Sequence, residues 1–280
     1  MSNVATRGHA SRPRAVDDHA PRKRFGQNFL ADPHYVARIV AAVDPKPGEH
    51  IVEIGPGLAA LTGGLVERAG HIDAIEIDRD LATRLRARFG ARELTLHEGD
   101  ALAFDYGALG SDLRIVGNLP YNISSPLLFH LVAHAANLSD LTVMLQKEVV
   151  DRMTARPGTA EYGRLTVMLQ AVFAIERLFT VPPGAFRPAP KVDSAVARLV
   201  PLRERAPAIS DRELFARVVT AAFSQRRKTL RNALAALCDA DGLRAAGIDP
   251  GARGETLSVA DFVRLANTLA NGTPAASKAP

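Results

Sequence analysis

The sequence predicts an α/β fold in which a mostly parallel sheet carries helices on both faces and a small all-α C-terminal domain follows. The first observation is that strand-like and helix-like apolar periods follow one another between residues 50 and 146, which is typical of βαβ units. The second is that the apolar spacing becomes purely helical between residues 211 and 270. With 280 residues, of which 47% are apolar, the chain is long enough for both parts.

The N-terminal elements can be assigned in chain order. Residues 1 to 21 contain few large apolar side chains and are predicted to form a disordered basic tail. Asp32 followed by Pro33 indicates a helix start, and that helix should end before Pro45. Beyond it, strands are predicted over residues 50–54, 72–77, 94–97, 113–116 and 141–146, and helices over residues 59–69, 79–89 and 125–135.

The remaining elements complete the sheet and form the second domain. Two amphipathic helical stretches after Glu148 precede strands over residues 174–181 and 194–202, with a stiff, proline-rich loop over residues 182–190 between them. Asp211 and Ser258 are predicted helix caps. The domains are therefore expected over residues 22–204 and 205–271, with a loose tail over residues 272–280.

Charge and composition narrow the class of protein. The net charge is +5, and the basic excess lies at both ends of the chain, while the central residues 25 to 202 are mildly acidic. Basic ends fit a polyanionic partner, although surface cations that only maintain solubility explain them equally well. No apolar run approaches the roughly 20 residues of a membrane span. The absence of a secretory signal and the single Cys238 predict a cytoplasmic protein without an internal disulfide.

A glycine turn predicts a nucleotide site. The strand at Glu53-Ile54 runs into Gly55-Pro56-Gly57 and then into a helix, which brings backbone N–H groups close to a ligand. Glu76 closes the next strand, where a carboxylate suits two ribose hydroxyls, and Asp100 ends the third strand, where it suits an adenine amino group. By itself the turn does not separate NAD from S-adenosylmethionine.

The tetrapeptide Asn118-Leu119-Pro120-Tyr121 at the end of the fourth strand favours methyl transfer to an amino nitrogen. A conjugated exocyclic amine is a poor nucleophile, so two acceptors must draw its lone pair out of the ring. The Asn118 side-chain oxygen and the Leu119 carbonyl supply two acceptors, because Pro120 fixes φ and removes a donor. Tyr121 offers a flat face for a base.

Taken together, these segments resemble the KsgA family of small-subunit ribosomal RNA adenine N6-dimethyltransferases. The likeness covers residues 22 to 271, and the departure is Ala59, where relatives often have glycine and where we expect a slight shift of the turn. It implies a Rossmann-like class I methyltransferase sheet with S-adenosylmethionine as cofactor. The similar segments are residues 23–30, 53–57, 118–124, 186–194 and 223–232.

The resemblance also implies roles for single residues. Asn28 and Leu30 would close over the cofactor and Gly55 would approach its amino-acid end. Glu76 would bind ribose, Asp100 would hold adenine, and Asn118 would lie between cofactor and substrate. A flipped adenine would then stack in a slot whose walls are Tyr121 and Phe186. The alternative for Phe186 is that it anchors the proline loop on the core. Phosphate contacts are expected from the basic patch, which consists of Arg226, Arg227, Lys228 and Arg231; a solvated charged face is the alternative.

The implied substrate is two adjacent adenosines in a hairpin near the 3′ end of small-subunit (16S) rRNA within a pre-30S particle, acted on by a monomer. No metal is expected, since none of the eight His residues stands at metal-ligand spacing with Cys or carboxylates. Three alternatives stay open. They are a macrolide-resistance type methyltransferase of large-subunit rRNA, a dinucleotide-dependent oxidoreductase, and a non-catalytic ribosome assembly factor with a methyltransferase fold.

Overall fold

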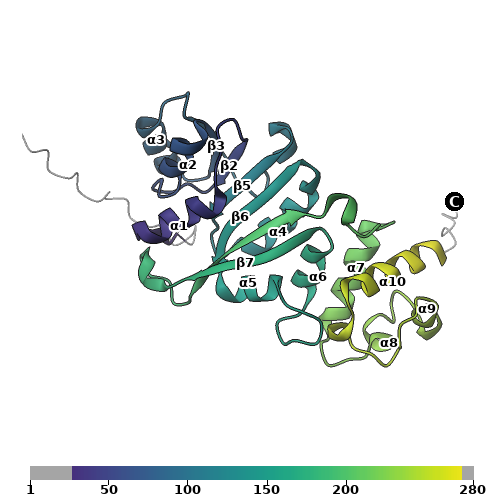
Figure 1. Cartoon of the computed structure of the whole chain (residues 1–280). Coiled ribbons are helices and arrows are strands. Elements are labelled where there is room, and N and C mark those ends of the chain that lie inside the picture. The colour runs from purple at the N-terminus through teal and green to yellow at the C-terminus, as the bar shows by residue number, and fades with distance from the viewer. Residues whose placement is uncertain (1–26, 273–280) are drawn as a thin grey trace, which may run out of the picture.

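The computed structural model describes residues 27–272 (Figure 1). The predicted tail over residues 1–21 and residues 273–280 of the predicted tail at the other end lie outside the described residues. The strands are β1 Phe29–Leu30, β2 Ile51–Ile54, β3 Ile72–Glu76, β4 Leu94–Glu98, β5 Leu113–Asn118, β6 Leu138–Gln146, β7 Phe173–Val181, β8 Phe186–Arg187 and β9 Ser194–Pro201. The α-helices are α1 Pro33–Val43, α2 Thr62–Ala69, α3 Arg79–Arg88, α4 Ser124–Ala133, α5 Lys147–Met153, α6 Arg164–Gln170, α7 Arg212–Ser224, α8 Leu230–Ala233, α9 Ala240–Ala245 and α10 Val259–Gly272.

Seven strands form one sheet in the order β4-β3-β2-β5-β6-β9-β7. The pairs from β4 to β6 are parallel, whereas β9 is inserted antiparallel between β6 and β7. A dinucleotide-binding doubly wound sheet continues outward with a parallel strand at this position. The antiparallel insertion therefore separates this sheet from the dinucleotide type, which the glycine turn alone did not do.

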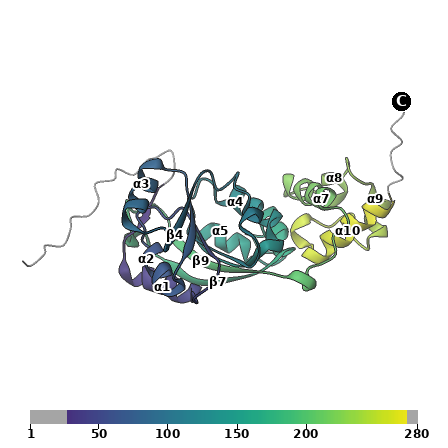
Figure 2. The same ribbon diagram turned by 90° about the horizontal axis from the view of Figure 1, so that it is seen from above.

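Helices cover both faces of the sheet, as predicted (Figures 1 and 2). Side chains of α1, α2 and α3 pack with one face of β2, β3 and β5 in one apolar cluster. Side chains of α4, α5 and α6 pack with the other face in a second cluster. Successive residues alternate between the clusters, as with Ile51 and Val52 of β2, because neighbouring side chains of a strand point to opposite faces.

The helices of the C-terminal part surround a third apolar cluster. The cluster also contains side chains from the segment around α6, so this part is packed directly onto the sheet-bearing part. The Tyr162 hydroxyl adds a hydrogen bond of 2.7 Å to the Leu257 carbonyl. The predicted caps are present, since Asp211 accepts from the Leu214 N–H at 2.9 Å and Ser258 forms a capping box with Asp261.

One helix is shorter than predicted, and another consists of a single turn. The helix expected from residue 59 begins at Thr62, because Gly55, Gly57 and Ala59 all have positive φ and keep the chain in a turn. The helix α8, which contains Arg231 of the basic patch, spans only Leu230–Ala233. Within the described part of the chain, every helix falls short of the length and hydropathy required to cross a membrane.

Candidate active site

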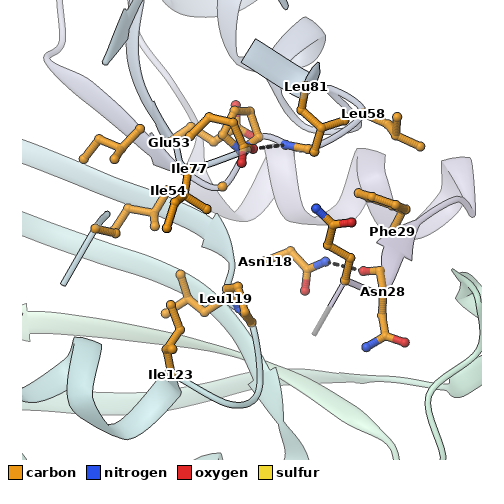
Figure 3. Close-up of a pocket in the computed structure, with 18 of the residues that line it drawn as sticks. Asn28, Phe29, Glu53, Ile54, Leu58, Ile77, Leu81, Asn118, Leu119 and Ile123 are labelled. Carbon is orange, nitrogen blue, oxygen red and sulfur yellow. Dashed lines mark hydrogen bonds between the residues drawn. The ribbon is translucent and has the colours of Figure 1, made fainter. Parts of the chain in front are cut away.

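A cavity of about 230 Å³ opens where the parallel strands end (Figure 3). Ligands of open α/β sheets bind outside the carboxyl ends of the strands, and this cavity occupies that position. It is lined by all of the predicted catalytic and cofactor-binding residues except Phe186: Asn28, Leu30, Gly55, Glu76, Asp100, Asn118, Leu119 and Tyr121. The tertiary structure thus brings together side chains that are spread over more than ninety positions of the sequence.

The glycine turn lines one wall of the cavity. Gly55 has φ +66° and Gly57 has φ +57°, values that L side chains rarely adopt. A Cβ atom on Gly57 would also lie 3.1 Å from the Phe29 ring, so the turn and the segment before α1 are in close contact. Ala59 has φ +63° and is 4% exposed, so the methyl group that replaces the expected glycine is accommodated in a left-handed, buried conformation.

Glu76 at the end of β3 is held rigidly by the backbone. One carboxylate oxygen accepts from the Gly57 N–H at 3.2 Å and the other from the Asp78 N–H at 2.9 Å. Burial raises the pKa of Glu76, and these two N–H groups counteract part of that shift. Since a carboxylate has about four lone-pair sites, both oxygens retain capacity to accept from ligand hydroxyls.

A second buried carboxylate in this wall, Glu53 of β2, was not among the predicted site residues. It is 2% exposed, and the Thr62 hydroxyl donates to it at 2.7 Å. Burial, opposed by that hydrogen bond and reinforced by the nearby charge of Glu76, raises the pKa of Glu53 to about 7. The signal that would have identified it is a charged residue inside an otherwise apolar strand directly before a glycine turn.

Asp100, in the loop that follows β4, also lines the cavity. Its Oδ1 atom accepts from the Leu102 N–H at 2.9 Å, which fixes the carboxylate against its own loop. The residue is exposed, so the other oxygen is available to a donor in the cavity.

Asn118 is oriented by a hydrogen bond across the cavity. Its Nδ2 atom donates to the Asn28 carbonyl at 2.9 Å, as the dashed line between them in Figure 3 marks. A carbonyl can only accept, so the nitrogen must face Asn28 and the side-chain oxygen must point the other way. The following residue is equally well defined, because the Leu119 N–H donates to the Met144 carbonyl at 3.0 Å.

Within residues 27–272 the carbonyl of Leu119 lacks a hydrogen-bond partner, whereas that of Pro120 has two. The Pro120 carbonyl accepts from the Ile123 N–H at 3.2 Å and from the Ser124 hydroxyl at 3.1 Å. The Leu119 carbonyl has no hydrogen-bond partner among residues 27–272. Two oxygen acceptors, one from a side chain and one from the backbone, therefore stand next to each other in the chain at the edge of the cavity.

Gly117, directly before Asn118, allows β5 to approach β2 closely. A Cβ atom at this position would lie 2.6 Å from the Ile54 carbonyl oxygen, a distance that real Cβ atoms do not show. Gly117 was not among the predicted site residues. A glycine inside a strand pattern is the signal for such a close approach of two backbones.

Two segments that are far apart in the sequence close the cavity together. β1 pairs antiparallel with β8, with Phe29 opposite Arg187 and Leu30 opposite Phe186. Leu30 is 6% exposed and lines the cavity. Phe186 is 0% exposed, packs in the apolar cluster beneath α1 and α2, and does not line the cavity. In this structure Phe186 therefore lies outside the cavity, which favours the alternative that it anchors the proline-rich loop; its role as a slot wall stays a prediction.

Tyr121 does line the cavity, and its hydroxyl is bonded to a distant residue. The phenol oxygen lies 2.6 Å from the hydroxyl oxygen of Ser194, the first residue of β9. Partial burial raises the pKa of Tyr121, so the phenol stays neutral near pH 7. The side chain is half-buried, which leaves part of the ring accessible.

The four cations of the basic patch do not share one environment. Arg226 donates to the Glu255 carboxylate at 3.2 Å and to the Tyr162 carbonyl at 3.3 Å, and it also bonds to the Ala160 carbonyl. These bonds join the segment before α6 to the C-terminal helices. Arg226 is exposed as well, so its predicted contact with RNA stays a prediction, but its guanidinium is already hydrogen-bonded at this junction. The side chains of Arg227, Lys228 and Arg231 are exposed and have no ion-pair partner within the described residues.

The described residues also contain no group of three or more His, Cys, Asp or Glu side chains that is arranged to hold a metal ion.

The fold and the site define a class I methyltransferase of the S-adenosylmethionine-dependent type. The parallel sheet with one antiparallel insertion, the glycine turn and the carboxylates at successive strand ends carry this conclusion. The chain belongs to the ribosomal RNA adenine dimethylase family, whose model matches residues 18–271. It is therefore an enzyme of that family, as the resemblance implied, and the oxidoreductase alternative is wrong.

Individual relatives agree with the family. The chain is 59% identical to ribosomal RNA small subunit methyltransferase A of Aromatoleum aromaticum over 93% of this chain and 98% of the relative. It is also 59% identical to the protein of the same name from Thiobacillus denitrificans, over 90% and 99% of the two chains. Among solved structures, a dimethyladenosine transferase from Plasmodium falciparum matches with a TM-score of 0.75 and 26% identity over 85% of this chain and 95% of that one. The 23S rRNA methyltransferase ErmE matches with a TM-score of 0.65 and 28% identity over 87% of this chain and 100% of that one.

Proposed function

We propose that this enzyme transfers methyl groups from S-adenosylmethionine to N6 of two adjacent adenosines in a hairpin near the 3′ end of small-subunit rRNA, within a pre-30S particle. The observation that carries the proposal is the pair of oxygens at Asn118 and Leu119. One is turned away from Asn28 by a hydrogen bond on the amide nitrogen, and the other lacks a partner within the described residues. The names of the relatives at 59% identity favour the small-subunit substrate.

The cavity suits S-adenosylmethionine, which supplies a methyl group on a positively charged sulfur. The proposal assigns Glu76 to the ribose hydroxyls and Asp100 to the adenine amino group. The positive-φ turn at Gly55 admits the amino-acid end of the cofactor without a Cβ collision, because nothing lies within 4 Å of the position where a Cβ would stand. Asn28 and Leu30 cover the ligand from the side of β1.

The target amine is activated by geometry. The Asn118 oxygen and the Leu119 carbonyl accept the two N6 hydrogens, which draws the nitrogen lone pair out of conjugation and turns it towards the methyl carbon. Tyr121 stacks on the flipped base, a contact worth roughly 1–3 kcal/mol per base. The alkylated nitrogen is acidic and loses a proton to water, so the chain needs no dedicated base. Catalysis then comes from positioning and from preorganised dipoles.

Phosphate contacts are assigned to Arg227, Lys228 and Arg231, whose side chains are exposed. Arg226 is not included. We also propose that the enzyme acts as a monomer in the cytoplasm. Analytical ultracentrifugation of the purified protein tests the oligomeric state, and cell fractionation tests the compartment.

Replacement of Asn118 by Ala tests the proposed chemistry. Purified protein is incubated with labelled S-adenosylmethionine and under-methylated small subunits, and the nucleosides are analysed. Loss of one preorganised polar group is expected to lower the rate by about 10²–10³. Asn137→Ala is a matched control, because Asn137 also donates to a backbone carbonyl, at 2.8 Å, but lies away from the cavity.

Two outcomes contradict the proposal. Dimethylation by the Asn118→Ala protein at the wild-type rate excludes the two-acceptor mechanism. Labelling of large subunits in preference to small subunits by the wild-type protein favours instead the alternative of the macrolide-resistance type, to which the likeness to ErmE points.

A further inference from the structure

The Tyr121 ring is fixed at two ends. Its backbone lies two positions after Leu119, whose N–H donates to the Met144 carbonyl of β6. Its hydroxyl is bonded to Ser194 of β9, 73 positions further along the chain. The side chain therefore links the segment after β5 to the first residue of β9, and rotation about its side-chain bonds is restricted at both ends.

Ser194 is itself immobilised. It is 0% exposed, and its backbone stands opposite Gln146 of β6 and Val181 of β7 in the antiparallel part of the sheet. The preceding carbonyl, that of Asp193, accepts from the Lys147 N–H at 2.9 Å. A hydroxyl in such a position has little freedom, so the atom to which Tyr121 is bonded belongs to the rigid sheet and not to a loop.

We propose that Ser194 is a positioning residue that holds the Tyr121 ring against the target base, and that the second methyl transfer depends on it more than the first. This inference rests on the proposed function, because it concerns the same cavity and the same substrate amine. It adds a residue and a step-specific effect to that function.

The number of N–H groups on the substrate gives the reason. Unmodified adenine presents two N6 hydrogens, which occupy both acceptors, Asn118 and Leu119. After one methylation only one hydrogen remains, so one of the two hydrogen bonds that orient the amine is lost. Stacking on the Tyr121 ring then supplies a larger share of the orientation. A misplacement of the reacting amine by about 1 Å lowers the rate on the order of 10²-fold. A less firmly held ring should therefore slow the second transfer more than the first.

The second transfer makes and breaks the same kinds of bonds as the first. A bond forms between N6 and the methyl carbon as the bond between that carbon and sulfur breaks, and the sulfur keeps the electron pair and becomes neutral. The last N6 proton leaves to water. Neutral Tyr121 does not take part in this proton transfer, which agrees with a phenol whose pKa is raised by burial. Its role, and that of Ser194, is confined to placement.

The test compares Ser194→Ala with Tyr121→Phe, two variants that remove the same hydrogen bond from opposite ends and keep the ring. Each is incubated in excess over under-methylated small subunits with S-adenosylmethionine. The amounts of N6-methyladenosine and N6,N6-dimethyladenosine are followed over time to obtain the rate constants of the two transfers. The ratio of the second rate constant to the first should fall about fivefold in both variants, the factor that corresponds to one typical hydrogen bond. The double variant should show no further fall.

Thr166→Val is the matched control for a purely structural effect. Thr166 is also 0% exposed, and its hydroxyl donates to the Arg152 carbonyl at 2.5 Å, but it lies on α6 away from the cavity. This variant should lose stability without a change in the ratio. The inference is overturned if the Ser194 and Tyr121 variants keep the wild-type ratio, or if Thr166→Val changes it equally. Failure of the wild-type protein to methylate small subunits would instead refute the proposed function.

Discussion

Replacement of Glu53 by Gln should make the folded protein less sensitive to alkaline pH. Glu53 is 2% exposed at the end of β2, and burial raises the pKa of its carboxyl from the ordinary value of 4.5 to about 7. Gln has the same shape and keeps an oxygen that accepts from the Thr62 hydroxyl. The substitution therefore removes the charge and leaves the packing and the hydrogen bond.

The direction follows from the raised pKa. Because the folded state prefers the protonated carboxyl, the contribution of Glu53 to stability is complete below the unfolded pKa of 4.5 and is lost as pH rises through about 7. A shift of this size corresponds to about 3 kcal/mol once the folded carboxyl is fully ionised. Roughly 2 kcal/mol of that loss falls between about pH 5.5 and 8.5.

Urea unfolding without cofactor, at about pH 5.5 and 8.5, measures the effect. The free energy of unfolding of Glu53→Gln relative to wild type should rise by about 2 kcal/mol between the two pH values. Glu67→Gln on the exposed side of α2 controls for the removal of a negative charge and should run parallel to wild type. If the Glu53 variant also runs parallel to wild type, burial does not raise this pKa and the electrostatic reasoning fails.

Two further predictions concern the basic patch and Phe186. The affinity for rRNA should fall with salt concentration, and the slope of log affinity against log salt should become smaller by about one in Arg227→Ala and in Lys228→Ala. In contrast, Arg226→Ala should leave this slope unchanged and lower the melting temperature. A slope that falls equally for Arg226 would place it among the phosphate contacts. Phe186→Ala should lower the free energy of unfolding by about 3–5 kcal/mol, as expected for a buried aromatic side chain. If the melting temperature is unchanged and activity is lost, Phe186 acts instead as a wall of the base slot.

Some features of this protein follow from local sequence alone. The strand and helix periods predicted the layered sheet, because side-chain spacing determines which face of an element is apolar. Asp32 and Asp211 identified helix starts, since a cap bonds to N–H groups only two or three positions away. The glycine turn and the Asn118 tetrapeptide identified the chemistry, because the reactive atoms are contiguous in the chain.

Only the tertiary structure decided which distant groups meet. The Asn118 side chain is oriented by a carbonyl 90 positions away, and Tyr121 by a hydroxyl 73 positions away. Phe186 is buried where β8 pairs with β1, and Arg226 is hydrogen-bonded to the segment before α6 where that segment meets the C-terminal helices. Sequence periodicity predicts which face of an element is apolar, but it does not predict which other element packs against that face. The packing partner determines whether a cation or an aromatic ring faces a ligand or the core.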